Sequence, residues 1–336
     1  MRDVAALAGV SHGTVSNYLN HPERVSQDKA DRVRAAIQTL GFVPNTPARQ
    51  LRLGESSAIA YIAPDVSNPY FATIAEGVEQ RAAERGLTVY IANSNRRRDR
   101  EDAYLALFEQ QKVRGLLVAS HGEVEERLAA VRTRGTPSVL VGQAASSPRQ
   151  PSVSVDDVAG GRLAAKHLLS LGRRRLAFVG GPVEVRQVRD RLAGARRAVR
   201  GVRGARLEVV LPVDRTIAAG HLAARELLAR APQDRPDAVF AVNDLLALGM
   251  LQALTDGGVR VPEDLALIGY DDIEFAAASL IPLSSIRSPH ESFGFAAVDA
   301  LLDDIAGTLA EPHQVHPPEL VVRTSTAGRG GAPATP

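Results

Sequence analysis

The sequence predicts two regions of different fold class: a small all-α head at the N-terminus and a large α/β region behind it. Three observations predict this division. Helical spacing and turn residues fill the first forty positions, continuous apolar runs alternate with helical stretches from residue 57 onward, and 336 residues are too many for one small domain. Such apolar runs are typical of strands buried on both faces, so we expect parallel sheets covered by helices.

Two short helices joined by a tight turn are predicted within residues 2–20. The first ends at Gly9, because a positive φ costs glycine nothing, and Ser11 offers its oxygen to the free amides of the second as an N-cap. The second helix buries Val15 and Leu19 and turns a polar face outward. This pattern predicts a helix-turn-helix, whose second helix fits the major groove of DNA. The DNA contacts predicted from it are Ser11, His12, Gly13, Thr14, Ser16, Asn17 and Asn20.

An ordinary helical hairpin is the alternative for this segment. A solvated helix face usually carries Glu and Lys, whereas the outward face here is short, polar and uncharged apart from a possible histidine charge. Residues 1–53 also hold seven basic against four acidic side chains, while the whole chain has a net charge of only +2. The excess positive charge therefore lies where phosphates would be met, which favours DNA binding weakly.

A third helix is predicted from the N-cap Ser26 to about Leu40, and Gly41 ends it. The runs "DVAALAGVS", "TVSNYLN" and "GFVPNTPARQL" together resemble the DNA-binding domain and hinge helix of the LacI/GalR family of bacterial transcription regulators. The resemblance implies a hinge helix from Asn45 to about Leu53, with Leu51 as a wedge in the minor groove. Packing of Leu51 against the third helix is the alternative. The DNA contacts implied in the hinge are Asn45, Ala48 and Leu51.

Two successive series of four apolar runs predict two doubly wound parallel-sheet subdomains in the region behind the hinge. The predicted strands are 58–63, 87–92, 115–119 and 138–142, then 175–180, 207–211, 238–242 and 265–269. By the resemblance this region is similar to periplasmic binding proteins, and it holds the effector. The predicted domains are 1–44, the hinge and linker 45–56, and 57–327, divided into 57–155 plus 287–315 and 156–286 plus 316–327, with a disordered tail at 328–336.

Open α/β sheets bind ligands at the carboxyl ends of their strands, and polar side chains follow several predicted strands. Asp65, Asn93 and Asn243 are such residues, although helix capping is the alternative for each and the better explanation for Asn95, Ser120 and Asp244. The resemblance implies that the arginine in "DRLAGA" and the aspartate after "LALIGY" hold ligand hydroxyls. It also implies that an aromatic pair flanks the ligand ring, with core packing as the alternative. The predicted effector residues are Asp65, Tyr70, Phe71, Asn93, Arg191, Asn243 and Asp271.

Composition and motifs argue against several other classes of protein. Without cysteine there is no disulfide framework or thiolate metal site, and the eight histidines are scattered without metal-ligand spacing. No G-x-G-x-x-G, G-x-x-x-x-G-K-S/T or H-E-x-x-H motif is present. The side chains of the adjacent pairs Asp156–Asp157 and Asp271–Asp272 would point oppositely in an extended segment, which makes them poor acid/base partners. We therefore expect no enzyme, cofactor or metal. With no signal peptide or apolar span recognised, we expect a soluble cytoplasmic protein without a membrane partner.

These observations predict a transcription regulator, and most simply a repressor of a carbohydrate-utilisation operon. A homodimer would read a near-palindromic double-stranded operator, and a sugar or sugar derivative between the subdomains would control binding. Arg186, Arg189 and Arg191 would suit an anionic ligand such as a sugar phosphate, although a solvated face explains the first two better. A regulator with a protein co-repressor remains an alternative. A solute-binding protein of the same fold is a further alternative. Such a protein is exported and has no DNA-binding head, and the missing signal peptide argues against it.

Overall fold

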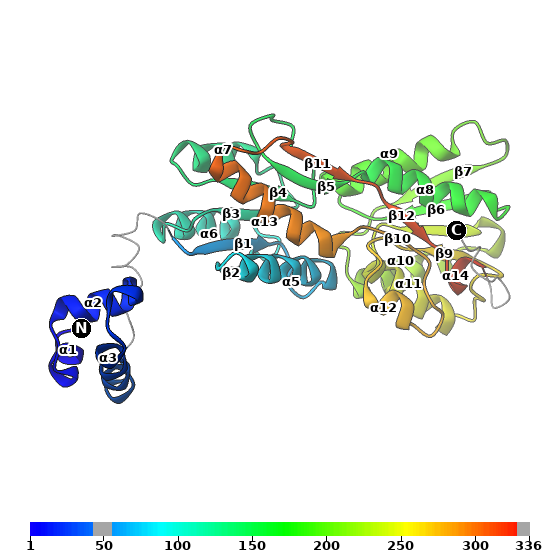
Figure 1. Cartoon of the computed structure of the whole chain (residues 1–336). Helices are drawn as coiled ribbons and strands as arrows, with labels where there is room; N and C mark the ends of the chain where they lie inside the picture. Colours follow the sequence, from blue (N-terminus) through cyan, green and yellow to red (C-terminus); the bar gives the residue numbers. More distant parts are fainter. Residues whose placement is uncertain (43–55, 328–336) are drawn as a thin grey trace. The chain divides into compact units, whose positions relative to one another are not determined.

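The computed structural model describes residues 1–42 and 56–327 (Figure 1). The predicted hinge contacts Asn45, Ala48 and Leu51 and the tail 328–336 lie outside the described residues. The chain divides into two compact units, Met1–Ser56 and Ser57–Pro336.

Within residues 1–42, the head consists of three helices and a short 3-10 turn around a small apolar core. Gly9 ends the first helix with a φ of +62°, a left-handed conformation that suits glycine, and the Ser11 hydroxyl accepts the Thr14 amide at 3.1 Å. Ser26 occupies the N-cap of the third helix, but its side chain makes no capping hydrogen bond, contrary to the prediction. The elements are α1 (Arg2–Ala8), α2 (His12–Asn20), η1 (Pro22–Arg24) and α3 (Gln27–Leu40). The core consists of Val4, Ala5, Ala8, Val15, Val33 and Ala36.

The larger unit begins with a lobe built on a parallel sheet of strand order β11-β5-β4-β3-β1-β2. Helices α5 and α13 cover one face of this sheet, and α6 and α7 cover the other (Figure 1). Its strands are β1 (Ala58–Ala63), β2 (Thr88–Asn93), β3 (Leu116–Ala119), β4 (Ser138–Val141), β5 (Ser152–Val155) and β11 (His313–His316). Its helices are α5 (Pro69–Glu84), α6 (Arg98–Gln110), α7 (Glu125–Thr133) and α13 (His290–Ala306).

The second lobe has a parallel sheet of order β7-β6-β8-β9 between two helix pairs, α8 with α9 and α10 with α11. A two-stranded antiparallel sheet, β10 with β12, lies beside it. The strands are β6 (Arg175–Val179), β7 (Arg206–Val210), β8 (Ala238–Ala241), β9 (Ala266–Ile268), β10 (Ser285–Arg287) and β12 (Glu319–Val321). The helices are α8 (Asp157–Ser170), α9 (Arg186–Val199), α10 (Ile217–Leu228), α11 (Asp244–Asp256), α12 (Glu274–Ala278) and α14 (Thr324–Ala327), with the 3-10 turn η2 (Pro232–Asp234).

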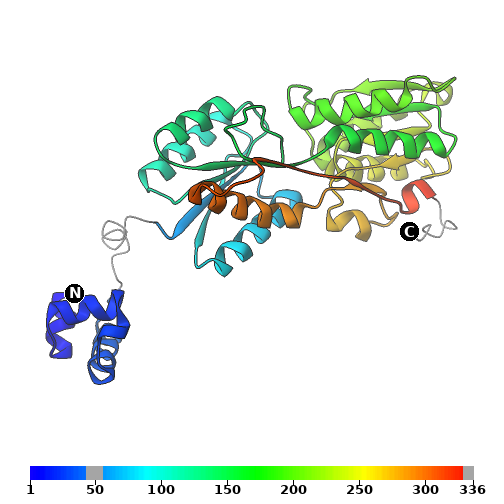
Figure 2. The ribbon, with the colours of Figure 1, turned by 45° about the horizontal axis from the view of Figure 1, so that its top comes forward.

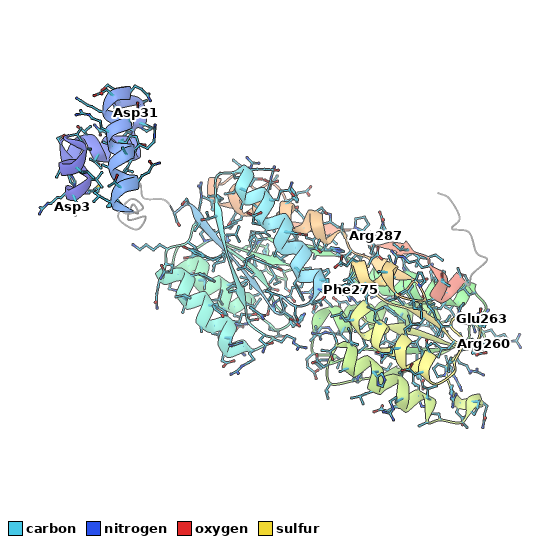
Figure 3. The ribbon with its side chains drawn as sticks, turned by 90° about the horizontal axis from the view of Figure 1, so that it is seen from below. Asp3, Asp31, Arg260, Glu263, Phe275 and Arg287 are labelled. Carbon is cyan, nitrogen blue, oxygen red and sulfur yellow. The ribbon has the colours of Figure 1, made fainter. Side chains whose placement is uncertain are left out.

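The chain passes between the lobes three times within residues 57–327: from β5 to α8, from β10 to α13 and from β11 to β12 (Figures 1 and 2). Arg287 lies at one of these passages, and Arg260 at the far end of the second lobe (Figure 3). The apolar runs did not predict β5, β10, β11 or β12, because each has only three or four residues and most contain polar side chains.

Two edge strands, β2 and β7, correct the prediction that the apolar runs are buried on both faces. Tyr90 and Ile91 of β2 are about half exposed, and no residue of β7 is fully buried. An edge strand has a neighbour on one side only, so its face can be less completely covered than that of a central strand, although the edge strand β9 is buried along its whole length. The central strands β1, β3 and β8 are buried along their whole length, as predicted.

Candidate functional site

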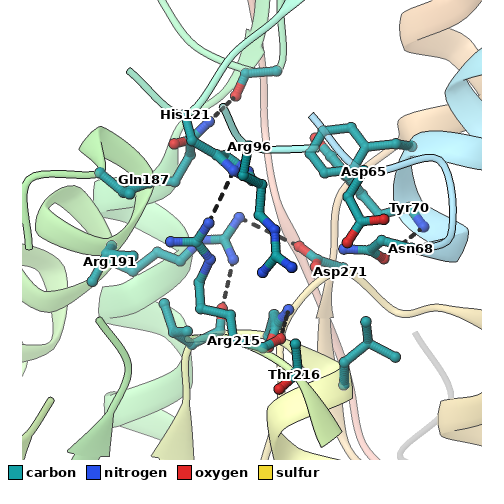
Figure 4. A pocket seen from close by; sticks show the side chains of 17 residues that line it. Asp65, Asn68, Tyr70, Arg96, His121, Gln187, Arg191, Arg215, Thr216 and Asp271 are labelled. Carbon is teal, nitrogen blue, oxygen red and sulfur yellow. Dashed lines mark hydrogen bonds and ion pairs between the residues drawn. The ribbon is translucent and has the colours of Figure 1, made fainter. Parts of the chain in front are cut away.

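A cavity of about 60 Å³ lies between the two lobes of the larger unit, at the carboxyl ends of the strands of both sheets (Figure 4). Loops after β1, β2, β3 and β4 line it from the first lobe, and α9 with the loops after β7, β8 and β9 lines it from the second. Its lining is Asp65, Asn68, Tyr70, Phe71, Arg96, His121, Gly142, Val185, Gln187, Val188, Arg191, Arg215, Thr216, Val242, Asn243, Leu245 and Asp271.

Six of the seven residues predicted to hold an effector line this cavity: Asp65, Tyr70, Phe71, Arg191, Asn243 and Asp271. Asn93 does not. It ends β2, and its side-chain oxygen accepts the Asn95 amide at 3.1 Å, so it stabilises the turn that follows the strand. Position after a strand was the only reason to select Asn93, and a turn satisfies it equally well.

A buried ion cluster occupies the second-lobe side of the cavity. The Arg191 Nε donates to Asp157 Oδ1 at 2.8 Å, and its Nη2 lies 3.3 Å from Asp271 Oδ1. A further guanidinium nitrogen, Nη1, donates to the Val242 carbonyl at 2.6 Å, and the guanidinium carbon lies 3.5 Å from the centre of the Tyr270 ring. All of these side chains are buried. The cluster therefore presents a rigid, oriented carboxylate and guanidinium to the cavity.

Close packing of α8 against α9 brings Asp157 beside Arg191. A Cβ atom at Gly161 would lie 2.0 Å from the Arg191 carbonyl oxygen, and one at Gly194 would lie 2.1 Å from the Val158 carbonyl oxygen. Only glycine allows the two backbones to approach this closely. Asp157 itself begins α8, one residue after the N-cap Asp156. In the sequence, Asp157 was considered only together with the adjacent Asp156 as a possible acid/base pair, so its role in the cluster was not predicted.

The backbone at Asp271 is held in an uncommon conformation. Asp271 and Asp272 have φ values of +102° and +56°, so this segment is not extended as predicted. The Asp271 amide donates to the Ile286 carbonyl at 2.8 Å, and the Asp272 amide donates to the Ser285 hydroxyl at 3.1 Å. The two carboxylates do separate, because Asp272 pairs with Arg287 and Arg323 rather than with Arg191. Positive φ in non-glycine residues at a cavity is typical of functional sites.

Burial controls the protonation of this cluster. It raises the pKa of Asp271 to about 7, against the opposing attraction of Arg191, and it also raises the pKa of Asp157. Burial opposes the charge of Arg191 as well, but the carboxylates of Asp157 and Asp271 more than compensate and raise its pKa. Asp271 is thus able to accept or donate a hydrogen bond near neutral pH.

Aromatic rings form the first-lobe side of the cavity. Tyr70 and Phe71 lie in the first turn of α5, both buried, with ring centres 5.0 Å apart and edge to face. Asn68 caps this helix by accepting the Tyr70 amide at 3.1 Å. The Asp65 carboxylate accepts from the amide and hydroxyl of Ser67, at 3.0 and 2.6 Å. An aromatic wall opposite an ion cluster suits a ligand with a ring and several hydroxyls.

Of the three residues explained as helix caps, none acts as an N-cap in the structure. Asn243 caps α11 by accepting the Leu246 amide at 3.1 Å, whereas Asp244 is buried and accepts from the Ser285 hydroxyl at 2.7 Å and the Ile273 amide at 2.9 Å. Asn95 has a φ of +52° in a turn, and the Ser120 hydroxyl accepts the Gly122 amide within its own loop.

Polar contacts join the lobes around the cavity, and none of them could be predicted from the sequence. Arg96 pairs with Asp214, and an Arg215 nitrogen lies 3.0 Å from His121 Nδ1. The side chain of Gln187 donates to the Gly142 carbonyl at 3.2 Å, and that of Arg186 to the Ala144 carbonyl at 2.8 Å. Each contact joins segments distant in sequence, so no local motif marks it.

The predicted DNA-contacting residues of the head gather at α2. Ser11 precedes the helix, and its hydroxyl lies 2.9 Å from that of Thr14. His12, Gly13 and Asn17 are exposed, Thr14 and Ser16 are half-buried, and Asn20 is the last residue of the helix.

Within residues 1–42 and 56–327, no cluster of three or more His, Asp or Glu side chains is arranged to hold a metal ion. No helix in that part of the chain has the length and apolar character needed to cross a membrane.

Comparisons with known proteins agree with this arrangement. A model of bacterial regulatory proteins of the lacI family matches residues 1–45, and a model of periplasmic binding protein-like domains matches residues 165–326. The chain is similar to the HTH-type transcriptional repressor PurR of Aliivibrio fischeri, with 32% identity over 98% of each chain. Among solved structures it resembles a transcriptional regulator CelR–cellobiose complex (33% identity, TM-score 0.72, covering 96% of this chain and 98% of that one). It also resembles a lac repressor dimer bound to operator and an anti-inducer (27%, 0.84, 97% and 98%).

Proposed function

Because the chain belongs to the lacI family of bacterial regulatory proteins, we propose that it is a homodimeric repressor of a carbohydrate-utilisation operon. It binds a near-palindromic operator in the cytoplasm and is not an enzyme. A small polyol effector, a sugar or sugar derivative, binds between the two lobes and controls operator affinity. The observation that carries the proposal is the Asp157–Arg191–Asp271 cluster opposite the aromatic pair Tyr70 and Phe71.

The cavity chemistry supports a polyol. Adjacent hydroxyls of a polyol can accept a hydrogen bond from a guanidinium and donate one to a neighbouring carboxylate. A sugar ring also has apolar C–H faces, which pack on aromatic rings. The CelR structure contains cellobiose, a ligand of this chemical class. Asp65 and Asn243 extend the polar lining around the same space.

The head supports sequence-specific DNA binding. In our proposal α2 enters the major groove, with His12 and Asn17 at base edges and Thr14 and Ser16 at phosphates. Homodimerisation follows from the same geometry, since a two-fold protein pair matches a near-palindromic operator. The lac repressor structure that the chain resembles is a dimer on operator DNA.

Control of DNA binding requires that the effector prefer one arrangement of the lobes. The polar contacts that join the lobes lie around the cavity, so a bound ligand would exchange with or reinforce them. Such a change would alter how the two heads of the dimer are held, and thereby operator affinity.

The test is Asp271→Ala in the full-length protein. We expect the variant to bind operator like the parent without effector and to lose the response to effector, since removal of a charged hydrogen-bonding group costs about 1.5–3 kcal/mol. Operator binding is measured by fluorescence anisotropy across a sugar library. Arg197→Ala, an exposed position on α9, is the control. A variant that responds at the parental effector concentration would show that the ligand binds elsewhere.

A further inference from the structure

Three guanidinium groups converge at the centre of the cavity, from Arg96, Arg191 and Arg215 (Figure 4). Two of them have carboxylate partners. Arg191 is shared between Asp157 and Asp271, and Arg96 pairs with Asp214. The positive charge of the third, Arg215, remains to be balanced.

Arg215 follows β7 and reaches across the cavity toward the first lobe. Its side chain makes two contacts, Nη1 to the Gly181 carbonyl at 3.3 Å and Nη2 to His121 Nδ1 at 3.0 Å. Both partners are neutral acceptors, because His121 must be unprotonated at Nδ1 to accept from a guanidinium. Within the described residues, no carboxylate forms an ion pair with Arg215.

The remaining carboxylates near the cavity are already engaged. Asp214 accepts the backbone amide of Arg215 at 2.7 Å, but its side chain pairs with Arg96. Asp65 accepts from Ser67, and Asp271 faces Arg191. Arg215 is therefore a half-buried cation whose charge the protein leaves without a direct counter-ion.

The pKa directions of the neighbouring groups show that the positive charges of Arg96, Arg191 and Arg215 lie close together. Burial, together with the nearby Arg191, lowers the pKa of Arg215 to about 10 against the opposing effect of Asp214, which leaves it charged at neutral pH. Burial and the positive charges of Arg215, Arg96 and Arg191 lower the pKa of His121 well below its usual value. A negative charge placed here would relieve both effects.

We propose that the effector is an acidic polyol, with a carboxylate or phosphate group held by Arg215 and Arg96 and hydroxyls held by Arg191 and Asp271. A guanidinium has five donors in a planar fork that matches a carboxylate or phosphate oxygen pair, and the two described contacts of Arg215 leave donors for a ligand. The proposal rests on the proposed function, since it assigns a chemical class to the ligand of the same cavity.

The test compares matched ligands by calorimetry with the full-length protein. The probes are sets of neutral sugar, aldonic acid, uronic acid and sugar phosphate built on the same hexoses and pentoses, with inorganic phosphate alone as a further probe. We expect at least one acidic member to bind about tenfold or more tightly than its neutral parent sugar. The carboxylate and phosphate arms then identify which anion the site takes.

Two variants of Arg215 test whether its positive charge causes this preference for acidic ligands. Arg215→Gln should remove the tenfold preference, Arg215→Lys should retain most of it, and Arg197→Gln on the exposed face of α9 should leave it unchanged. If circular dichroism shows that Arg215→Gln does not fold, Arg215→Lys is compared with the parent at two salt concentrations instead. The preference for acidic ligands should then persist in Arg215→Lys and weaken as the salt concentration rises.

The outcomes distinguish a failure of the acidic-effector proposal from a failure of the proposed function. Equal or tighter binding of neutral sugars, or an acid preference that survives Arg215→Gln, would overturn the acidic effector while the cavity still served a polyol. Absence of binding by every acidic member would overturn it as well. Binding that survives Asp271→Ala unchanged would instead contradict the proposed function, because the ligand would then lie outside the cavity.

Discussion

The head and the cavity present polar groups in opposite ways. On α2 the outward side chains are exposed or half-buried and carry no acidic or lysine charge, and they come from one run of ten residues. In the cavity the charged groups of Arg191 and Asp271 are buried, and the lining comes from segments between Asp65 and Asp271. The α2 side chains therefore meet solvent directly, whereas Arg191 and Asp271 are held in place inside the protein.

This difference should appear in energetics. An exposed side chain exchanges water for a ligand, so its removal costs little stability and acts on binding alone. A buried charge is balanced by its neighbours, so its removal leaves a partner unpaired and affects folding as well as binding. Substitutions in the two regions should therefore differ in kind as well as in size.

Arg191→Ala is the largest expected effect, because it leaves the Asp157 and Asp271 carboxylates buried without a cation. We expect the free energy of unfolding of the larger unit to fall by about 3–5 kcal/mol. Calorimetric unfolding of the full-length protein measures it. The matched control Arg197→Ala, exposed on the same helix, should change stability by less than about 0.5 kcal/mol. Equal losses in the two variants would mean that the cluster contributes no more than a solvated arginine.

On the head, substitution of Asn17 should change DNA preference without changing stability. Asn17→Gln should alter the preferred base at one symmetric pair of operator positions, by about 1–3 kcal/mol if the parent contact is bidentate. Ser16→Ala should instead weaken all sequences about equally, as loss of a phosphate contact does. Selection from a randomised operator library with parent and variants distinguishes the two. An unchanged consensus for Asn17→Gln would place base reading elsewhere in the head.

The same contrast explains what could be predicted from the sequence. The helix-turn-helix depends on local signals, such as Gly9 and the Ser11 cap, and both are present in the structure. The long apolar runs likewise predicted the eight principal strands. Strand ends located Asp65 and Asn243 at the cavity, because carboxyl ends of parallel strands meet at one edge of a sheet, and the family resemblance located Asp271.

What the sequence could not reveal depends on contacts between distant segments. Adjacent aspartates in an extended segment point oppositely, so the sequence gives Asp157 no acid/base partner, yet the approach of α8 to α9 carries it to Arg191. Arg215 and His121 meet only when the two lobes are placed together. Arginine is also so frequent in this chain that its presence in a loop carried no signal by itself. Charge balance is a property of the folded site, and no local pattern in the sequence determines it.

Asp271→Asn should reveal the raised pKa of the cavity carboxyl through the pH dependence of stability. The pKa rises from its usual value of 3.8 to about 7 in the folded protein, mainly through burial. Between these values the unfolded chain releases this proton more readily, so the folded state loses up to about 1.4 kcal/mol per pH unit as pH rises. Above about pH 7 both states are ionised and the loss stops.

The asparagine variant lacks this titration. Its melting temperature relative to the parent should therefore rise between pH 5 and pH 7 and remain constant above. Asp272→Asn is the adjacent control, because that residue is paired with Arg287 and Arg323 outside the cavity cluster. A difference between the Asp271→Asn variant and the parent that stays the same at every pH would contradict a proton bound at Asp271.

Gly13→Ala is the smallest expected effect. It tests whether a more stable α2 still recognises the same operator sequence. A Cβ atom at Gly13 would meet only the Ser11 hydroxyl, at 3.7 Å, an ordinary contact. Alanine is favoured over glycine in a helix by about 1 kcal/mol, so the head should become more stable and its amides about fivefold better protected from hydrogen exchange. The matched control is Gly9→Ala, which should lower protection because Gly9 has a φ of +62°. Since Gly13 offers no side chain to a base, the operator consensus should stay the same while affinity changes little. A changed consensus would show that DNA approaches the backbone at Gly13 too closely for a methyl group, and that this glycine takes part in recognition.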